Sequence, residues 1–315
     1  MTAAARTLVF LASAGIVMAA SSTGGSDDLP VRIRLGDVNW TTEIASAAVM
    51  PGRSLTIEVR DPARRRWAFA APTGRVTRRT ATRWTWRAPQ EPGIVDAWLS
   101  AAGDDEARAE LKLLVMVPAD RVTPSGRLNG YRIGTYPARP LNGNPLYLPP
   151  PGFIEVTRDN EDEPVSPRFR LGQFTSKQSK DFPKYVVLEP ALIARLEQLA
   201  GRLEALDLPS KLHVMSGYRT PYYNRAIGNV RYSLHQWGVA ADVFVDEDGD
   251  GTMDDLNGDK RIDRADAARL LEIADALDRR PGETRPFAGG LGLYGGTRAH
   301  GPFVHIDVRG RPARW

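Results

Sequence analysis

The sequence contains no cysteine and little histidine. Disulfide bonds, thiol nucleophiles and thiolate-held zinc or iron–sulfur sites are therefore excluded. In 315 residues the only imidazoles are His213, His235, His300 and His305. An excess of one charge is also lacking, because 42 Lys and Arg nearly balance 38 Asp and Glu. No basic block indicates nucleic-acid binding, and the 42% hydrophobic and 25% charged content is that of a globular protein.

One apolar run, at residues 8–20, stands near the N-terminus. It follows Arg6 and is itself followed by small residues. The run is shorter than the roughly 20 residues of a membrane-spanning helix, but it has the pattern of a signal peptide. We therefore expect residues 1–22 to direct export to the periplasm or cell envelope, leaving a mature chain without a transmembrane segment. An uncleaved N-terminal anchor is the alternative.

Residues 30–118 have the pattern of a small all-β domain. Apolar and polar residues alternate in several short runs, which turn residues such as Pro51-Gly52 separate. Five of the seven tryptophans fall here: Trp40, Trp67, Trp84, Trp86 and Trp98. Short strands with buried aromatics favour an immunoglobulin-like sandwich. A surface stripe of tryptophans that binds sugars is the alternative.

The rest of the chain divides into a linker and an α+β domain. Residues 119–168 are rich in proline, glycine and asparagine, which is typical of a linker or an extended loop. In residues 169–315, apolar spacing predicts helices near 190–203 and 265–277. Strands are expected at 212–215, 240–245 and 303–308. Strands separated by helices and long loops favour an α+β domain, with an antiparallel sheet, over regular βαβ winding.

Two short segments carry most of the residues suited to metal binding: residues 233–242 (SLHQWGVAAD) and 300–307 (HGPFVHID). Alternation along the second strand sends Phe303, His305 and Asp307 to one face. If the two strands are neighbours, His305 and Asp242 converge, and the loop before Asp242 brings His235 to the same point. Imidazole and carboxylate are good zinc ligands. The alternative is that each histidine is a hydrogen-bonded structural residue.

Three motifs in this order resemble the zinc D-Ala-D-Ala peptidases, the LAS-type murein carboxypeptidases and endopeptidases: SGYRT, SLHQWGVAAD and FVHIDVRG. The resemblance covers the C-terminal half of the chain. It implies a zinc ion held by His235, Asp242 and His305, with Arg219 binding the substrate. The Arg219 guanidinium is also suited to a catalytic role, the stabilisation of charge on the tetrahedral intermediate. Zinc in such a site lowers the pKa of bound water towards about 7 and polarises the scissile carbonyl.

The general base is less well defined by the resemblance. Many relatives carry a histidine two residues before the last ligand, or a glutamate shortly before it, whereas Phe303 occupies the first of these positions here. The candidates are His300, which resembles a catalytic histidine of some carboxypeptidases, and Asp307. We favour His300. Asp307 is instead suited to orienting a ligand imidazole.

The resemblance implies an exported zinc metallopeptidase that hydrolyses D-amino-acid-containing bonds in peptidoglycan stem or cross-link peptides. The binding partners of such an enzyme are peptidoglycan peptides. We expect the protein to be a monomer. The alternative is a catalytically inactive peptidoglycan-binding protein that retains the metal pocket. The motif contains all three zinc ligands, which favours the enzyme.

The acidic segment at residues 246–266 predicts a second metal site, for calcium. It contains nine acidic and three basic residues. Two registers match an EF-hand-type loop. The preferred one resembles a dockerin loop and uses Asp255, Asn257, Asp259, Asp263 and Asp266. The earlier one uses Asp246, Asp248 and Asp250, followed by Gly251. The alternatives are a solvated acidic insertion and a protein-docking loop.

Overall fold

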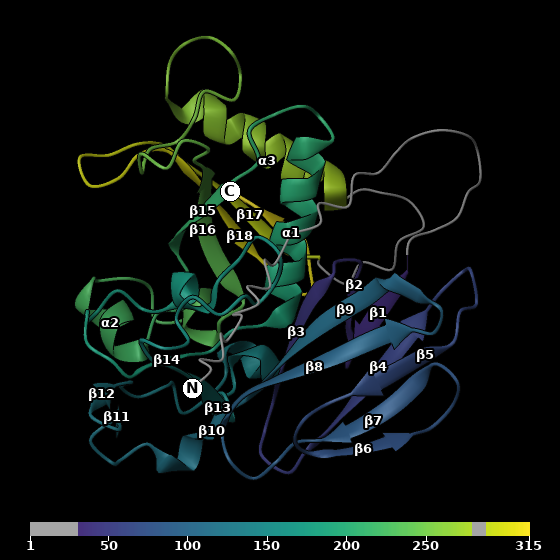
Figure 1. Cartoon of the computed structure of the whole chain (residues 1–315). Coiled ribbons are helices and arrows are strands. Elements are labelled where there is room, and N and C mark those ends of the chain that lie inside the picture. Colours follow the sequence, from purple (N-terminus) through teal and green to yellow (C-terminus); the bar gives the residue numbers. More distant parts are fainter. Residues whose placement is uncertain (1–30, 279–287) are drawn as a thin grey trace, which may run out of the picture.

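The computed structural model describes residues 31–278 and 288–315, so the expected signal peptide at residues 1–22 lies outside the described residues. An all-β region at the N-terminal end adjoins a mixed helix and strand region at the C-terminal end (Figure 1). Within the described ranges, no helix is both long and apolar enough to cross a membrane.

The N-terminal region contains two sheets. The first has the order β2-β1-β4-β7-β6: β2 (Val38–Trp40), β1 (Arg32–Leu35), β4 (Ser54–Arg60), β7 (Arg83–Arg87) and β6 (Arg75–Arg78). The second has the order β3-β9-β8-β5: β3 (Ile44–Val49), β9 (Asp104–Val115), β8 (Gly93–Ala101) and β5 (Trp67–Ala70). All pairs are antiparallel except β3 and β9, which are parallel.

Alternating burial along these strands forms a core that includes most of the tryptophans. In β4, for example, every second residue is buried, as expected of strands with one face inside. Trp40, Trp67, Trp84 and Trp86 are buried, which confirms their assignment to the core. Trp98 is half-buried beneath the guanidinium of Arg108. Two sheets around one core are what a sandwich requires, and the immunoglobulin-like assignment stays a prediction.

The segment expected to be a linker, residues 119–168, is folded against both neighbouring regions. β13 (Gly152–Val156) pairs with β10 (Val117–Pro118) and β14 (Lys184–Val186), and β11 (Arg127–Leu128) pairs with β12 (Tyr131–Arg132). Several side chains of the segment are fully buried: Leu128, Ile133, Phe153, Ile154 and Val156. They belong to a core cluster that continues from the sandwich into the C-terminal region.

The C-terminal region is built on a five-stranded sheet with the order β15-β16-β18-β17-β19. Its strands are β15 (Leu212–Ser216), β16 (Ala240–Val245), β17 (Gly290–Tyr294), β18 (Phe303–Asp307) and β19 (Ala313–Arg314). All pairs are antiparallel except β17 and β19. The helices are α1 (Pro190–Glu204), α2 (Pro221–Ala226) and α3 (Arg264–Asp278), of which α3 packs on β17 and β18. The two longer helices and strands β15, β16 and β18 lie where the sequence predicts them, whereas β17 and β19 were not predicted.

Helix α1 connects the two regions. Pro190 opens it in the first turn, where the missing N–H costs nothing. Its apolar residues recur at helical spacing and are buried, among them Leu192, Leu196, Leu199 and Leu203. The helix contacts α3 on one side and β2 and β3 of the sandwich on the other (Figure 1).

A buried lysine joins the N-terminal sandwich to residues 119–168, which we call the middle segment. The Lys112 ammonium, on β9, lies 2.8 Å from Asp96 and 2.7 Å from Glu110, and it also bonds Glu163 of the middle segment. Burial alone would lower the pKa of this lysine, but the three carboxylates raise it above its usual value. Lys112 therefore stays charged, and it holds together three acidic groups that would otherwise repel one another.

Replacing this ammonium with an apolar group is expected to destabilise the chain. Lys112→Met leaves the three carboxylates without their shared cation, so we expect a loss of about 3 kcal/mol in the free energy of unfolding. Urea denaturation followed by circular dichroism measures it. The exposed Lys180→Met is the matched control and should change stability little. Equal effects of the two substitutions would contradict this role for Lys112.

Candidate metal centre

Strand pairing brings two of the predicted ligands together. β16 and β18 are antiparallel neighbours, and Asp242 lies directly opposite His305. The third ligand, His235, belongs to a short 3-10 helix, Leu234–Trp237, that leads into β16. This helix ends at Gly238, whose φ is +66°, and a Cβ there would stand 2.1 Å from the carbonyl oxygen of Val187. Glycine is therefore required at the turn that returns the chain to the sheet.

The middle segment supports the loop that carries His235. The hydroxyl of Tyr136 donates to the carbonyl of Gln236 at 2.9 Å, and the indole N–H of Trp237 donates to the carbonyl of Leu148 at 2.9 Å. Tyr147 packs edge-on against Trp237, with ring centroids 5.1 Å apart. The position of His235 thus depends on residues from both the C-terminal region and the middle segment.

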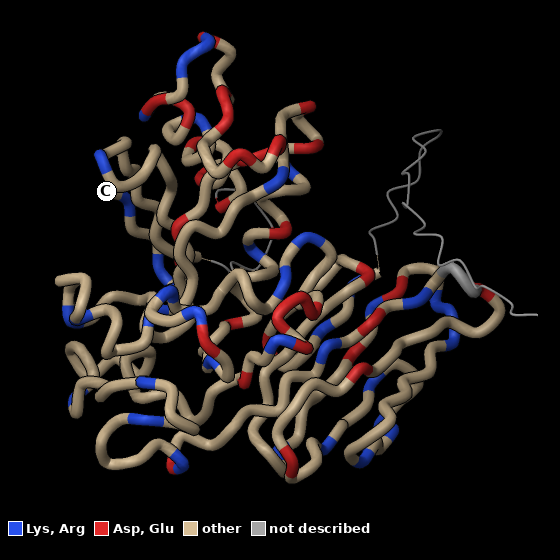
Figure 2. The backbone as a smooth tube through the Cα atoms, turned by 60° about the vertical axis from the view of Figure 1, so that its left-hand side comes forward, with Lys and Arg blue, Asp and Glu red and all other residues tan. Residues whose placement is uncertain are grey.

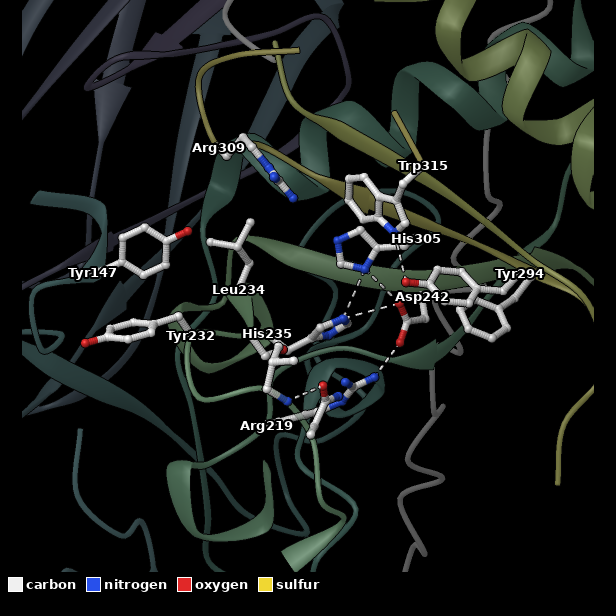
Figure 3. Close-up of a pocket in the computed structure, with 14 residues that line it drawn as sticks. Tyr147, Arg219, Tyr232, Leu234, His235, Asp242, Tyr294, His305, Arg309 and Trp315 are labelled. Carbon is white, nitrogen blue, oxygen red and sulfur yellow. Dashed lines mark hydrogen bonds and ion pairs between the residues drawn. The ribbon is translucent and has the colours of Figure 1, made fainter. Parts of the chain in front are cut away.

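The ligand atoms of the three residues converge on one point, as Figure 3 shows. His305 Nδ1 lies 2.9 Å from Asp242 Oδ1, and His235 Nε2 lies 3.2 Å from each of these atoms. All three residues are buried. A tetrahedral zinc site with bonds of 2.0–2.1 Å has edges of about 3.3 Å between ligand atoms. Because the observed separations are close to this value, the donor set fits a zinc ion.

Each ligand is oriented by a further contact on its outer side. His235 Nδ1 donates to the carbonyl of Gly217 at 2.7 Å, which directs the Nε2 lone pair inward. His305 Nε2 lies 3.2 Å from Asp307 Oδ2, which leaves Nδ1 facing the other ligands. Asp242 Oδ2 accepts a hydrogen bond from Arg219. Such outer contacts fix the tautomer and the rotamer of metal ligands.

The electrostatics favour a neutral His235 and an anionic Asp242. Burial alone would lower the pKa of His305, but its hydrogen bonds to Asp242 and Asp307 raise it. Burial lowers the pKa of His235, so this imidazole is neutral. Burial alone would raise the pKa of Asp242, but His235 and His305 hold it well below its usual range. Asp307 is likewise kept ionised, since hydrogen bonds from His305 and Arg309 outweigh its burial and hold its pKa below the usual range. Asp242 is therefore an anionic ligand.

The centre opens onto a cavity of about 440 Å³. Arg219 and Arg309 line it, together with the rings of Tyr147, Tyr232 and Trp315 (Figure 3). Arg309 forms a bidentate ion pair with Asp307, and its guanidinium lies 5.0 Å from the Trp315 ring. Trp315 also packs beside His305, with ring centroids 5.3 Å apart. The cavity therefore combines a metal-binding set with cationic and aromatic walls.

The two candidates for the general base, His300 and Asp307, lie in different surroundings. His300 is outside the lining of this cavity, on the loop before β18, where its ring contacts Phe303 and its Nδ1 lies 2.8 Å from the Gly301 oxygen. Asp307 touches a ligand, but it is buried and ion-paired, as an orienting group would be. Among the described residues that line the cavity, Asp242 is the only carboxylate.

Sequence reasoning missed much of the lining, including Arg309, Trp315 and Tyr147. Extending the alternation of His305 and Asp307 by two residues would have placed Arg309 on the same side. Tyr147 gives no such signal, because a loop of the middle segment brings it to the cavity.

Comparison with known families matches residues 168–264 to the family described as Peptidase M15. This segment is therefore similar to the M15 peptidases, which supports the resemblance to the zinc D-Ala-D-Ala peptidases. The match includes Arg219, His235 and Asp242, and it ends before His305. M15 peptidases are zinc-dependent, in agreement with the buried His–Asp–His group.

No curated protein matches the chain. Among solved structures, an alignment to the adhesin InvE of Yersinia pseudotuberculosis has 16% identity and a TM-score of 0.18. It covers 30% of this chain and 29% of that one, so the chain spans less than a third of InvE. This likeness carries no argument about fold or function.

The contact between Asp307 and His305 predicts the effect of a conservative substitution. Asp307→Asn removes the charge that orients His305, so zinc affinity should fall by about 10- to 100-fold. Competition with a chromophoric chelator measures the affinity, and circular dichroism checks the fold. His300→Ala, outside the cavity, should leave the affinity unchanged. An unaltered affinity in Asp307→Asn would contradict the orienting role.

Proposed function

We propose that this protein is an exported zinc peptidase that hydrolyses D-amino-acid-containing bonds in peptidoglycan stem or cross-link peptides. The observation that carries the proposal is the buried group of His235, Asp242 and His305 at the wall of a cavity. The M15 match supports the metallopeptidase chemistry. The signal-peptide pattern of residues 1–22 supports export, which would bring the protein to the cell wall.

Zinc held by these three residues supplies Lewis acidity, which polarises a peptide carbonyl and acidifies water near neutral pH. The chain's own residues prepare the site for this chemistry. The Gly217 carbonyl and the Asp307 carboxylate hold the outer imidazole nitrogens of His235 and His305. Asp307, kept ionised, retains the proton on His305 Nε2 and so positions this ligand.

The charge of the site favours an anionic substrate. The carboxylates of Asp242 and Asp307 are matched by the guanidiniums of Arg219 and Arg309, and His235 is neutral. A bound divalent ion therefore leaves the site with net positive charge. Guanidinium groups are well suited to bind carboxylates, and the stem peptides of peptidoglycan end in a carboxylate.

The aromatic walls are suited to the rest of a peptide. Tyr147 and Tyr232 meet edge to face, with ring centroids 5.6 Å apart, and both line the cavity. Trp315 lines it beside His305. Rigid rings of this kind pack against peptide backbone and alanine methyl groups and keep water from the reacting bond.

Removing either imidazole should abolish both metal binding and activity. In His235→Ala or His305→Ala the remaining donors are too few for a stable zinc site. We expect zinc content, measured by mass spectrometry of the purified protein, and peptide hydrolysis to be lost together. The control is His213→Ala, because His213 is half-exposed and lies outside the cavity. Stoichiometric zinc in both ligand variants would refute the assignment.

A digest of purified peptidoglycan fragments tests the substrate. The zinc-loaded protein should release a terminal D-alanine from stem peptides or divide cross-linked dimers, and product masses distinguish the two reactions. The His305→Ala variant serves as the inactive control. Binding of fragments without any cleavage would overturn the proposed activity in favour of a wall-binding protein that retains the metal pocket.

A further inference from the structure

Backbone hydrogen bonds join the first loop of the acidic insertion, which lies between β16 and α3, to the end of the sheet. The N–H of Asp246 donates to the Lys211 carbonyl, and the N–H of Asp254 donates to the Val245 carbonyl, each at 2.9 Å. Acidic residues recur along this insertion, beyond the end of the sheet (Figure 2). The first loop, residues 246–254, is thus anchored directly to the end of β16.

Carboxylates converge in this first loop and not in the register that the sequence favours. Oxygens of Asp246, Asp248 and Asp250 lie within 4.8 Å of one another. In the later register the carboxylate of Asp255 accepts from backbone N–H groups of its own loop, and Asp266 accepts from the N–H groups of Leu256, Asn257 and Asp263. No group of three acidic residues forms there within the described chain.

Asp246 has a buried oxygen atom without a partner. The residue is 3% exposed, and its Oδ2 accepts from the N–H of Gly251 at 3.2 Å. Its Oδ1 is buried and has no hydrogen-bond partner. A buried carboxylate oxygen left unpaired is costly, because it has lost its hydration without compensation. A cation at the convergence point would satisfy it.

The side chains nearby do not neutralise this charge. Burial raises the pKa of Asp254, and the charges of Asp248 and Asp246 raise it further. His213 Nδ1 lies 3.7 Å from Asp246 Oδ2, but burial lowers the pKa of this imidazole. The Lys211 ammonium contacts the backbone carbonyl of Glu247. The loop therefore holds several carboxylates close together with an incomplete counter-charge.

Packing also distinguishes the two registers. Met253, in the first loop, is 1% exposed and belongs to the main core cluster. Ile262, at the equivalent eighth position of the later register, is 54% exposed. The eighth position of the first loop is therefore anchored in the core, whereas the later loop is anchored by Leu256 near its start and not at its eighth position.

We propose that Asp246, Asp248 and Asp250 bind a calcium ion. An all-oxygen set suits calcium, whose coordination geometry is variable, better than magnesium, which demands a strict octahedron. The loop continues β16, which carries Asp242, and leads to α3, which packs on the strand of His305. Calcium that binds only the folded chain stabilises this whole arrangement by mass action. The site is independent of the proposed peptidase activity.

Calcium titration of the full-length protein tests the proposal. The protein is stripped on a chelating resin, given one equivalent of ZnCl₂, and titrated with CaCl₂ by calorimetry and by thermal unfolding. We expect binding with a dissociation constant on the order of 10⁻⁵–10⁻³ M and a melting temperature raised by a few degrees. Asp248→Asn with Asp250→Asn, both exposed side chains, should weaken binding at least about tenfold and remove the shift.

The matched control changes the later register by the same charge. Asp255→Asn with Asp259→Asn should keep both the binding and the shift. The proposal is overturned if the unaltered chain shows no shift, or if NaCl or MgCl₂ at equal ionic strength gives the same one. It is also overturned if only the control variant loses binding, or if both variants lose it equally, since the effect would then follow the later register or the net charge.

Discussion

The site depends on the register of two antiparallel strands, β16 and β18. With Asp242 opposite His305, both side chains point to the same face of the sheet. A slip by one residue would turn one of them to the other face, where Val304 and Ile306 are buried in the core. The packing of α3 on β18 therefore helps to fix the register on which the metal centre depends.

Asp242 links metal binding to the wall of the cavity. One of its oxygens faces the two imidazoles, and the other accepts from the guanidinium of Arg219, whose backbone N–H donates to the His235 carbonyl. The resemblance to known peptidases implies only a substrate-binding role for Arg219. In the structure the same guanidinium also binds Asp242. A substrate that binds Arg219 would therefore also change the surroundings of this metal ligand.

The ligand set was predicted from the motif resemblance, and local patterns in the sequence supported it. Alternation along each strand puts His305 and Asp242 on the cleft-facing side, so they converge if the two strands pair. Helix periodicity predicted α1 and α3. Features that depend on contacts between distant parts of the chain could not be predicted from the sequence. The position of His300 depends on how the loop before β18 folds. The register of the acidic insertion depends on the burial of Met253, which composition does not reveal.

The folded unit that supports the metal site includes the middle segment, which precedes all three peptidase-like motifs. Tyr147 and Tyr136 reach the cavity and the His235 loop from residues that precede the matched family region. A chain cut at residue 168 would lose these supports and would expose apolar surface that Leu128 and Phe153 now cover. Any transfer of this metal-binding region to another protein must therefore include the preceding segment.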